Sequence, residues 1–248
     1  MLLKLKKSLG QHLLISPGVI AKIAKLAQIK EGEVLVEIGP GTGNLTRELL
    51  KYPFKRLYLL EIDKEMVEYL ERTITDGRVI ILKTDAVNFN FNSLQENQLK
   101  VLGNLPYNVA SLILENIIYY HQLISEGLFL VQKELAEKWL SGKSWLSIFI
   151  LTFYDLVYLM SIPPRFFRPP PKVISSLIKI IRNPKAKIPD LPLYKKFLTS
   201  LYQNRRKMLR RKIPESLLEK VSIRGDRRAE ELDIREVLDL YQLWTKSH

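Results

Sequence analysis

The chain has 248 residues, which is enough for one large hydrophobic core and a small second domain. Because it has no cysteine and only three histidines, disulfides, thiol nucleophiles and cysteine-ligated metals are excluded, and we expect no metal site. The beginning of the sequence lacks the apolar core and cleavage site of a signal peptide, and no segment is typical of a membrane span, so we expect a cytoplasmic protein.

The net charge of +13 is concentrated near the C-terminus. Residues 185–228 contain fourteen lysines and arginines against four aspartates and glutamates. One interpretation is a solvated helical surface that keeps the protein in solution. The density of one sign of charge favours the alternative, a surface that binds a polyanion such as nucleic acid.

Apolar segments alternate with amphipathic segments of helical length in the first half of the chain. Strands are predicted at 34–39, 56–62, 79–86, 100–105 and 127–132. Strands that are apolar on both faces and separated by helices are typical of a parallel, doubly wound sheet. The predicted fold class is therefore α/β.

The pattern changes after residue 145. The apolar segment 146–162 is predicted to form one long or bent strand, and 175–183 a second one, so that the two form an antiparallel pair at one edge of the sheet. A connector with five prolines separates them and is expected to be extended. Beyond it the sequence becomes helical and basic, which predicts a domain of residues 1–184 followed by a second of residues 185–248.

A glycine-rich motif, EIGPGTG, follows the first predicted strand and precedes a helix. Gly39, Gly41 and Gly43 come directly after the acidic residue Glu37. A simple turn would need one glycine, whereas three allow the backbone to approach a ligand closely. The motif alone is a weak signal, and it differs from the dinucleotide-binding pattern.

The next three strands also end in polar residues. Glu61 is placed to accept hydrogen bonds from both hydroxyls of a ribose, Asp85 to accept one from an adenine amino group, and Asn104 begins the segment NLPY. Each of them alone could be a helix cap, which is the common use of such residues after a strand. Together at one sheet edge they indicate a nucleoside pocket without a phosphate clamp.

Together with these polar strand ends, the segment NLPY resembles a site at which an amino group is methylated. The side-chain oxygen of Asn104 and a neighbouring backbone carbonyl can accept the two N–H groups of a base, while Pro106 fixes the backbone without adding a donor. Tyr107 offers an aromatic face on which a flipped base can stack. In this combination the chain resembles class I S-adenosylmethionine-dependent methyltransferases that act on an exocyclic amino nitrogen.

The order and spacing of SLGQHLL, EIGPGTG, LLEID, GNLPYNVAS, FLVQKELAE and RFFRPPPKV resemble the rRNA adenine N6,N6-dimethyltransferase family. That resemblance implies a Rossmann-like, seven-stranded, mostly parallel sheet with an antiparallel edge hairpin and a small helical C-terminal domain. It implies S-adenosylmethionine as cofactor and dimethylation of two adjacent adenines in a hairpin near the 3′ end of small-subunit (16S) rRNA. The family usually has QNFL where this chain has QHLL, which makes the contact of His12 less secure.

The predicted site residues fall into three groups; the resemblance implies the first two, and the density of basic charge predicts the third. The cofactor contacts are His12, Leu14, Gly39, Gly41, Gly43, Glu61, Ile62, Asp85, Ala86 and Asn104. Methyl transfer is assigned to Asn104, Leu105, Pro106 and Tyr107, with Phe167 as a second aromatic wall against the target adenine. The RNA-binding residues, expected on one helix, are Arg205, Arg206, Lys207, Arg210, Arg211 and Lys212.

The expected partner is small-subunit rRNA within an immature 30S particle, bound by a monomer. Two alternatives remain. A sister group methylates adenine N6 of 23S rRNA and confers antibiotic resistance; Leu105 and its context favour the small-subunit enzyme. An RNA-binding assembly factor on the same scaffold could have lost its catalytic side chains, but Glu61, Asp85 and Asn104 are all present.

Overall fold

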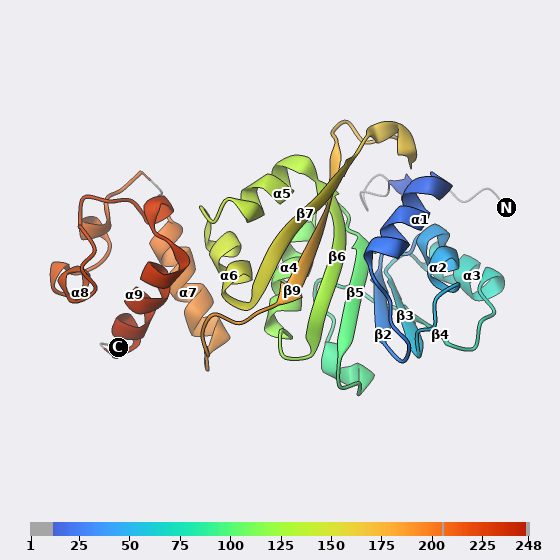
Figure 1. Cartoon of the computed structure of the whole chain (residues 1–248), viewed down its shortest axis with the longest axis horizontal. Helices are drawn as coiled ribbons and strands as arrows, with labels where there is room; N and C mark the ends of the chain where they lie inside the picture. The colour runs from blue at the N-terminus through green and yellow to red at the C-terminus, as the bar shows by residue number, and fades with distance from the viewer. Residues whose placement is uncertain (1–11, 205, 247–248) are drawn as a thin grey trace. The chain divides into compact units, whose positions relative to one another are not determined.

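The computed structural model describes residues 12–204 and 206–246 (Figure 1). Internal contacts divide the chain into two units. One comprises the residues up to Ala136 together with Val157–Arg182, and the other comprises Glu137–Leu156 together with the residues from Asn183 onward. The second unit therefore contains 137–156 in addition to the segment beyond the predicted boundary near residue 185.

A seven-stranded sheet forms the centre of the first unit, with the strand order β4-β3-β2-β5-β6-β9-β7. Its parallel part consists of β2 (Val34–Ile38), β3 (Arg56–Glu61), β4 (Val79–Lys83), β5 (Leu99–Asn104) and β6 (Ile124–Gln132). β9 (Ser175–Arg182) pairs antiparallel with β6, and β7 (Tyr154–Ile162) lies beyond it. The prediction of a mostly parallel sheet with antiparallel strands at one edge is confirmed.

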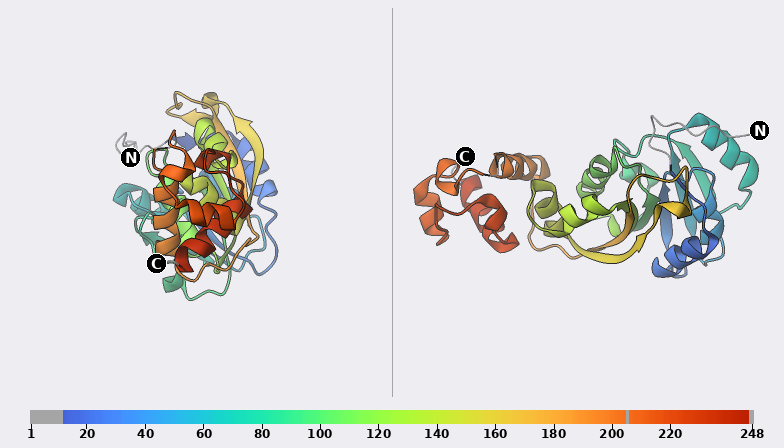
Figure 2. Two further views of the ribbon diagram at one scale, coloured as in Figure 1. Left: turned by 90° about the vertical axis from the view of Figure 1, so that its left-hand side faces the viewer. Right: turned by 90° about the horizontal axis from the view of Figure 1, so that it is seen from above.

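Helices cover both faces of this sheet. They are α1 (Pro17–Leu26), α2 (Asn44–Leu49), α3 (Lys64–Thr73) and α4 (Ala110–Tyr119). α1 and α4 lie on opposite faces, as the views in Figures 1 and 2 agree. On one face of the sheet, Leu35 and Leu57 pack with Ile23 of α1 in one core cluster. Because successive side chains of a strand point to opposite faces, the neighbouring residues of these strands pack on the other face. The central strands β2 and β5 are buried on both faces, as is typical of a parallel sheet, whereas the outer strands β4 and β7 are partly exposed.

Two short strands attach the N-terminal segment to the proline-rich connector. β1 (Leu13–Leu14) pairs antiparallel with β8 (Phe167–Arg168), which follows the 3-10 helix η3 (Pro164–Phe166). The backbone N–H of Ile15 donates to the carbonyl of Phe166 at 2.9 Å. These bonds place the segment that begins at His12 beside the ends of the parallel strands.

The prediction of one strand over 146–162 is wrong in its first half. Residues Trp145–Phe153 form α6, which follows α5 (Lys133–Leu140), and only then does β7 begin. Ser144 caps α6 by accepting the N–H of Ser147, and the hydroxyl of Thr152 donates to the carbonyl of Ile148. Because α6 is apolar all round and buried, it has no polar face to mark a helical period, so its β-branched and aromatic residues misled the prediction.

The second unit is helical and has its own aromatic core. Beyond α6 it contains α7 (Leu191–Tyr202), the 3-10 helices η4 (Leu209–Arg211) and η5 (Ala229–Glu231), α8 (Glu215–Lys220) and α9 (Ile234–Lys246). The ring of Tyr194 contacts those of Phe149 and Tyr241, which joins α7 to α6 and α9.

No helix within residues 12–204 and 206–246 is long and apolar enough to cross a membrane. The short helix η2 (Phe91–Leu94) belongs to the first unit.

Candidate active site

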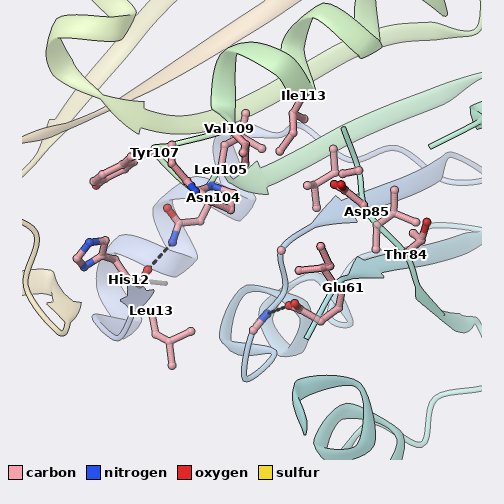
Figure 3. Close-up of a pocket in the computed structure, with 18 residues that line it drawn as sticks. His12, Leu13, Glu61, Thr84, Asp85, Asn104, Leu105, Tyr107, Val109 and Ile113 are labelled. Atoms are coloured by element: carbon pink, nitrogen blue, oxygen red, sulfur yellow. Dashed lines mark hydrogen bonds between the residues drawn. The ribbon is translucent and has the colours of Figure 1, made fainter. Parts of the chain in front are cut away.

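A pocket of about 900 Å³, partly open to solvent, lies at the carboxyl ends of the parallel strands (Figure 3). The strand order places the ends of β4, β3, β2 and β5 side by side, so residues distant in sequence meet there. Of the predicted site residues, the pocket is lined by His12, Gly39, Gly41, Glu61, Ile62, Asp85, Ala86, Asn104, Leu105, Pro106 and Tyr107.

The glycine motif forms the turn between β2 and α2. Gly39 has φ 66° and Gly41 has φ 56°, a conformation that is strained for any residue with a side chain. A Cβ on Gly41 would also lie 2.5 Å from the side chain of Leu13. The motif therefore serves both the turn and the close approach of β1 across the pocket, which explains why a single glycine would not suffice.

Glu61 ends β3 with its carboxylate fixed beneath the pocket. One oxygen accepts the N–H of Gly41 at 3.1 Å, and the other accepts the N–H of Asp63 at 2.9 Å. Burial raises the pKa of the Glu61 carboxyl, and the two N–H bonds oppose that rise. Each oxygen has a second lone pair, so the carboxylate can still accept hydrogen bonds from two hydroxyls of a ligand.

Asp85 and its neighbours line the pocket where β4 ends. One oxygen of Asp85 accepts the N–H of Val87 at 2.9 Å, as in a local turn, while the side chain as a whole remains exposed. Ile62 is 49% exposed although it is a large apolar residue, and Ala86 is held in place by a bond from Asn116 to its carbonyl. A flat apolar ligand lying between Glu61 and Asp85 would cover this surface.

The amide of Asn104 has one orientation in the structure. Its Nδ2 donates to the backbone carbonyl of His12 at 2.6 Å, so Oδ1 is directed away from that carbonyl (Figure 3). The next residue, Leu105, is buried and donates its N–H to the carbonyl of Leu130. This bond extends the β5–β6 pairing to the first residue of the loop and fixes where the NLPY segment leaves the sheet.

Tyr107 lies across the pocket from Glu61 and Asp85 (Figure 3). Its ring stacks on that of His12, with centroids 5.4 Å apart and an interplanar angle of 28°. Its hydroxyl lies 2.5 Å from Oγ of Ser175. His12 in turn contacts the carbonyl of Pro169 through Nδ1 at 2.8 Å. The half of the pocket around Asn104 is therefore aromatic, whereas the half around Glu61 is acidic.

Three predicted contacts do not line the pocket. Leu14 and Phe167 are paired in β1 and β8, and both side chains point into the hydrophobic core, at 7% and 2% exposure. Leu13, whose side chain points the opposite way along β1, takes the place expected for Leu14. Gly43 caps α2 with φ 75° and faces Leu70 rather than the pocket. The predicted role of Phe167 as an aromatic wall is thus not met, because pairing with β1 turns its ring inward.

Sequence reasoning missed several residues of the lining. Thr84, Asn108, Val109 and Ile113 belong to the pocket, together with Leu13, Ile38 and Leu60. Val109 and Ile113 lie one helical turn apart at the beginning of α4, directly after the NLPY loop. That spacing was the signal available in the sequence, but it is equally typical of a helix packed on a sheet.

Glu37 is buried in β2 beside the glycine motif. Its carboxyl accepts a hydrogen bond from the hydroxyl of Thr46 on α2 at 2.7 Å. Burial raises the pKa of Glu37 to about 7, with a further contribution from the charge of Glu61. Glu37 belongs to no group of three or more possible metal ligands, since none occurs within the described residues.

The predicted RNA-binding residues do not share a helix. α7 ends at Tyr202, because the backbone of Gln203 is extended, and Asn204 follows with a positive φ of 55°. Arg205 lies outside the described residues. The side chains of four residues are exposed: Arg206, Lys207, Arg210 and Arg211. Lys212 instead donates to the carbonyl of Leu201 at 2.7 Å, and burial lowers its pKa.

Comparison with known proteins agrees with this geometry. The family model described as "Ribosomal RNA adenine dimethylase" matches residues 2–246. A protein of Persephonella marina named "Ribosomal RNA small subunit methyltransferase A" is 44% identical over 247 residues, which cover 95% of this chain and 92% of that protein.

Two solved structures share the fold. A dimethyladenosine transferase from Plasmodium falciparum superposes with a TM-score of 0.82 at 24% identity, over 95% of this chain and 98% of that one. The 23S rRNA methyltransferase ErmE superposes with a TM-score of 0.73 at 22% identity, over 93% and 98%. The predicted class I methyltransferase fold is confirmed, and on the match over nearly its whole length the chain belongs to the ribosomal RNA adenine dimethylase family.

Proposed function

We propose that this enzyme transfers methyl groups from S-adenosylmethionine to the exocyclic N6 of two adjacent adenines in a hairpin near the 3′ end of small-subunit (16S) rRNA. The observation that carries the proposal is the fixed amide of Asn104, whose Nδ2 is bonded to His12 and whose Oδ1 is left for a substrate N–H. The name of the Persephonella marina relative supports the small subunit as the source of the RNA.

The acidic half of the pocket suits the adenosine part of the cofactor. Glu61 has two acceptor positions left for the ribose hydroxyls, and Asp85 has a carboxylate oxygen for the adenine amino group. The exposed side chain of Ile62 and the buried Ala86 would pack against the adenine ring. When bound, S-adenosylmethionine supplies a methyl group on a positively charged sulfur, which makes that methyl group reactive toward a nitrogen lone pair.

The other half of the pocket prepares the adenine nitrogen. In free adenine the N6 lone pair is delocalised into the ring, so the amino group is a poor nucleophile. Oδ1 of Asn104 accepts one N–H and the backbone carbonyl of Leu105 a second, which draws the nitrogen toward tetrahedral geometry and directs its lone pair at the methyl group. Tyr107 stacks on the base. As the N–C bond forms, the bond between the methyl carbon and the sulfur would break and leave neutral S-adenosylhomocysteine, and the nitrogen would lose one proton to water.

The exposed arginines and Lys207 of the second unit would contact RNA phosphates, since each phosphate contact releases bound counterions and adds affinity. We further propose that the protein acts in the cytoplasm as a monomer, without a metal, on an immature 30S particle. There the target hairpin is still accessible to an enzyme.

The proposal is tested by incubating the protein and methyl-labelled S-adenosylmethionine with immature small subunits and mapping the modified bases. We expect label on two adjacent adenines near the 3′ end, with N6,N6-dimethyladenosine as the final product. Asn104→Ala should nearly abolish labelling although the protein stays folded, because the amino group would lose its acceptor. Labelling of large-subunit RNA in its place would favour the 23S alternative, and RNA binding without methyl transfer would favour an assembly factor.

A further inference from the structure

Ser175 connects the loop that contains Tyr107 to the central sheet. It is the first residue of β9, its side chain is fully buried, and its backbone pairs with Gln132 of β6. Tyr107 belongs to the loop between β5 and α4, beyond Leu105, whose N–H makes the last bond of the β5–β6 pairing. The contact of 2.5 Å between the two hydroxyl oxygens therefore ties a loop residue to a rigid element.

The phenol of Tyr107 is suited to hold a position rather than to move a proton. Burial raises the pKa of Tyr107 above its ordinary value of 10.0, so the phenol is protonated near neutral pH and cannot act as a base there. One face of its ring is covered by His12. With the face and the hydroxyl both held, the tilt of the ring is determined by His12 and Ser175.

We infer that Ser175 is a positioning residue for methyl transfer: its hydroxyl sets the tilt of the Tyr107 ring, and thereby the position of the target adenine beside Asn104. This role rests on the proposed function, because it requires an adenine stacked on Tyr107. The angle at which the nitrogen lone pair meets the methyl group depends on the plane of the base. Small misplacements of a reacting atom are costly in rate.

Ser176 provides a matched control on the same strand. It is also a fully buried serine, but its hydroxyl has no hydrogen-bond partner among the residues that the structure describes. Ser176→Ala therefore makes the same chemical change one residue away without removing a contact of Tyr107. Tyr107→Phe removes the same hydrogen bond as Ser175→Ala from the opposite side and keeps the ring.

The test compares Ser175→Ala, Tyr107→Phe, the double variant and Ser176→Ala on immature small subunits. We expect kcat to fall about two- to ten-fold in both single variants, the scale of one hydrogen bond, and to fall no further in the double variant. Cofactor affinity measured by calorimetry should stay unchanged in all four proteins. Substituting 2-aminopurine for the target adenine should give brighter fluorescence with Ser175→Ala than with Ser176→Ala, because a base held less firmly against the tyrosine is quenched less.

The outcomes separate this inference from the proposed function. If the wild-type protein methylates its adenines and Ser175→Ala is as fast as Ser176→Ala, Ser175 has no positioning role. If the losses of kcat in the two single variants multiplied in the double variant, the shared hydrogen bond would not be their common cause. A wild-type protein that methylates no adenine would instead contradict the proposed function.

Discussion

At the scale of single residues, the site is built from side chains that are already bonded before any ligand enters. Glu61 accepts two backbone N–H groups, Asn104 donates to a carbonyl, and Tyr107 contacts a serine. Each bond fixes an orientation and leaves lone pairs facing the pocket. Such groups need little reorganisation when a substrate binds, which favours the charge distribution of the transition state.

The role of Glu61 is tested by Glu61→Ala. Hydrogen bonds to a charged group typically contribute about 1.5–3 kcal/mol each, so we expect affinity for S-adenosylmethionine to fall at least roughly tenfold. RNA affinity should change little, because Glu61 is buried in the pocket. Glu68→Ala removes the same charge from an exposed position on α3 and should bind the cofactor normally. Isothermal titration calorimetry measures both; equal affinities would remove Glu61 from the cofactor site.

At the scale of elements, the parallel strands could be predicted because apolar segments ended in glycine or polar residues at regular intervals. Two features of the fold could not be predicted from the sequence. The burial of α6 on all sides removed its amphipathic signal, and the two-residue strands β1 and β8 are too short to have one. Phe167 and Leu14 were assigned to the pocket because nothing local in the sequence reveals that the two segments pair and turn both side chains inward.

The buried carboxyl of Glu37, which bonds β2 to α2, should make the free energy of unfolding depend on pH. The pKa of Glu37 is about 7 in the folded protein, against an ordinary value of 4.5. The folded state therefore binds this proton more tightly than the unfolded state, and the free energy of unfolding falls as pH rises from about 4.5 to about 7, by on the order of 3 kcal/mol. Glu37→Gln removes this dependence.

Urea denaturation at pH 5 and pH 8 measures the effect. The stability of Glu37→Gln relative to the wild type should rise between the two pH values by that amount. Glu71→Gln, at an exposed position of α3, should keep the wild-type dependence. If Glu37→Gln and the wild type lose the same stability over this range, Glu37 does not titrate there.

At the scale of the whole molecule, the pocket and the exposed arginines belong to two units with different chemistry. The pocket is formed entirely by residues of the first unit, and the exposed arginines belong to the second. Family, fold, enzyme class and cofactor followed from the order of motifs along the chain, and the comparisons confirm them. The arrangement of the basic residues did not follow, because their density suggested one helix, whereas α7 ends at Tyr202 and the backbone of Gln203 is extended.

Replacing Arg206, Arg210 and Arg211 together by alanine tests the basic surface. Each phosphate contact contributes roughly −0.7 to −0.9 to the slope of log affinity against log salt, so the slope should flatten by about two to three. Cofactor binding should be unaffected, because none of the three residues lines the pocket. Filter binding to target RNA over a range of salt concentrations gives the slope, with Arg224→Ala, which is paired with Asp226, as control. An unchanged slope together with full activity would show that the RNA binds to another surface of the protein.

Deamidation, the slow loss of a side-chain amide as ammonia, would convert Asn104 into aspartate. The new carboxylate has no N–H for the carbonyl of His12, which lies 2.6 Å from Nδ2 in the intact protein. Two oxygens would then face each other, and the segment before β1 would lose its bond to the end of β5. Since neither atom belongs to the hydrophobic core, the fold would survive the change. Deamidation of this one amide would therefore stop the proposed methyl transfer without unfolding the protein.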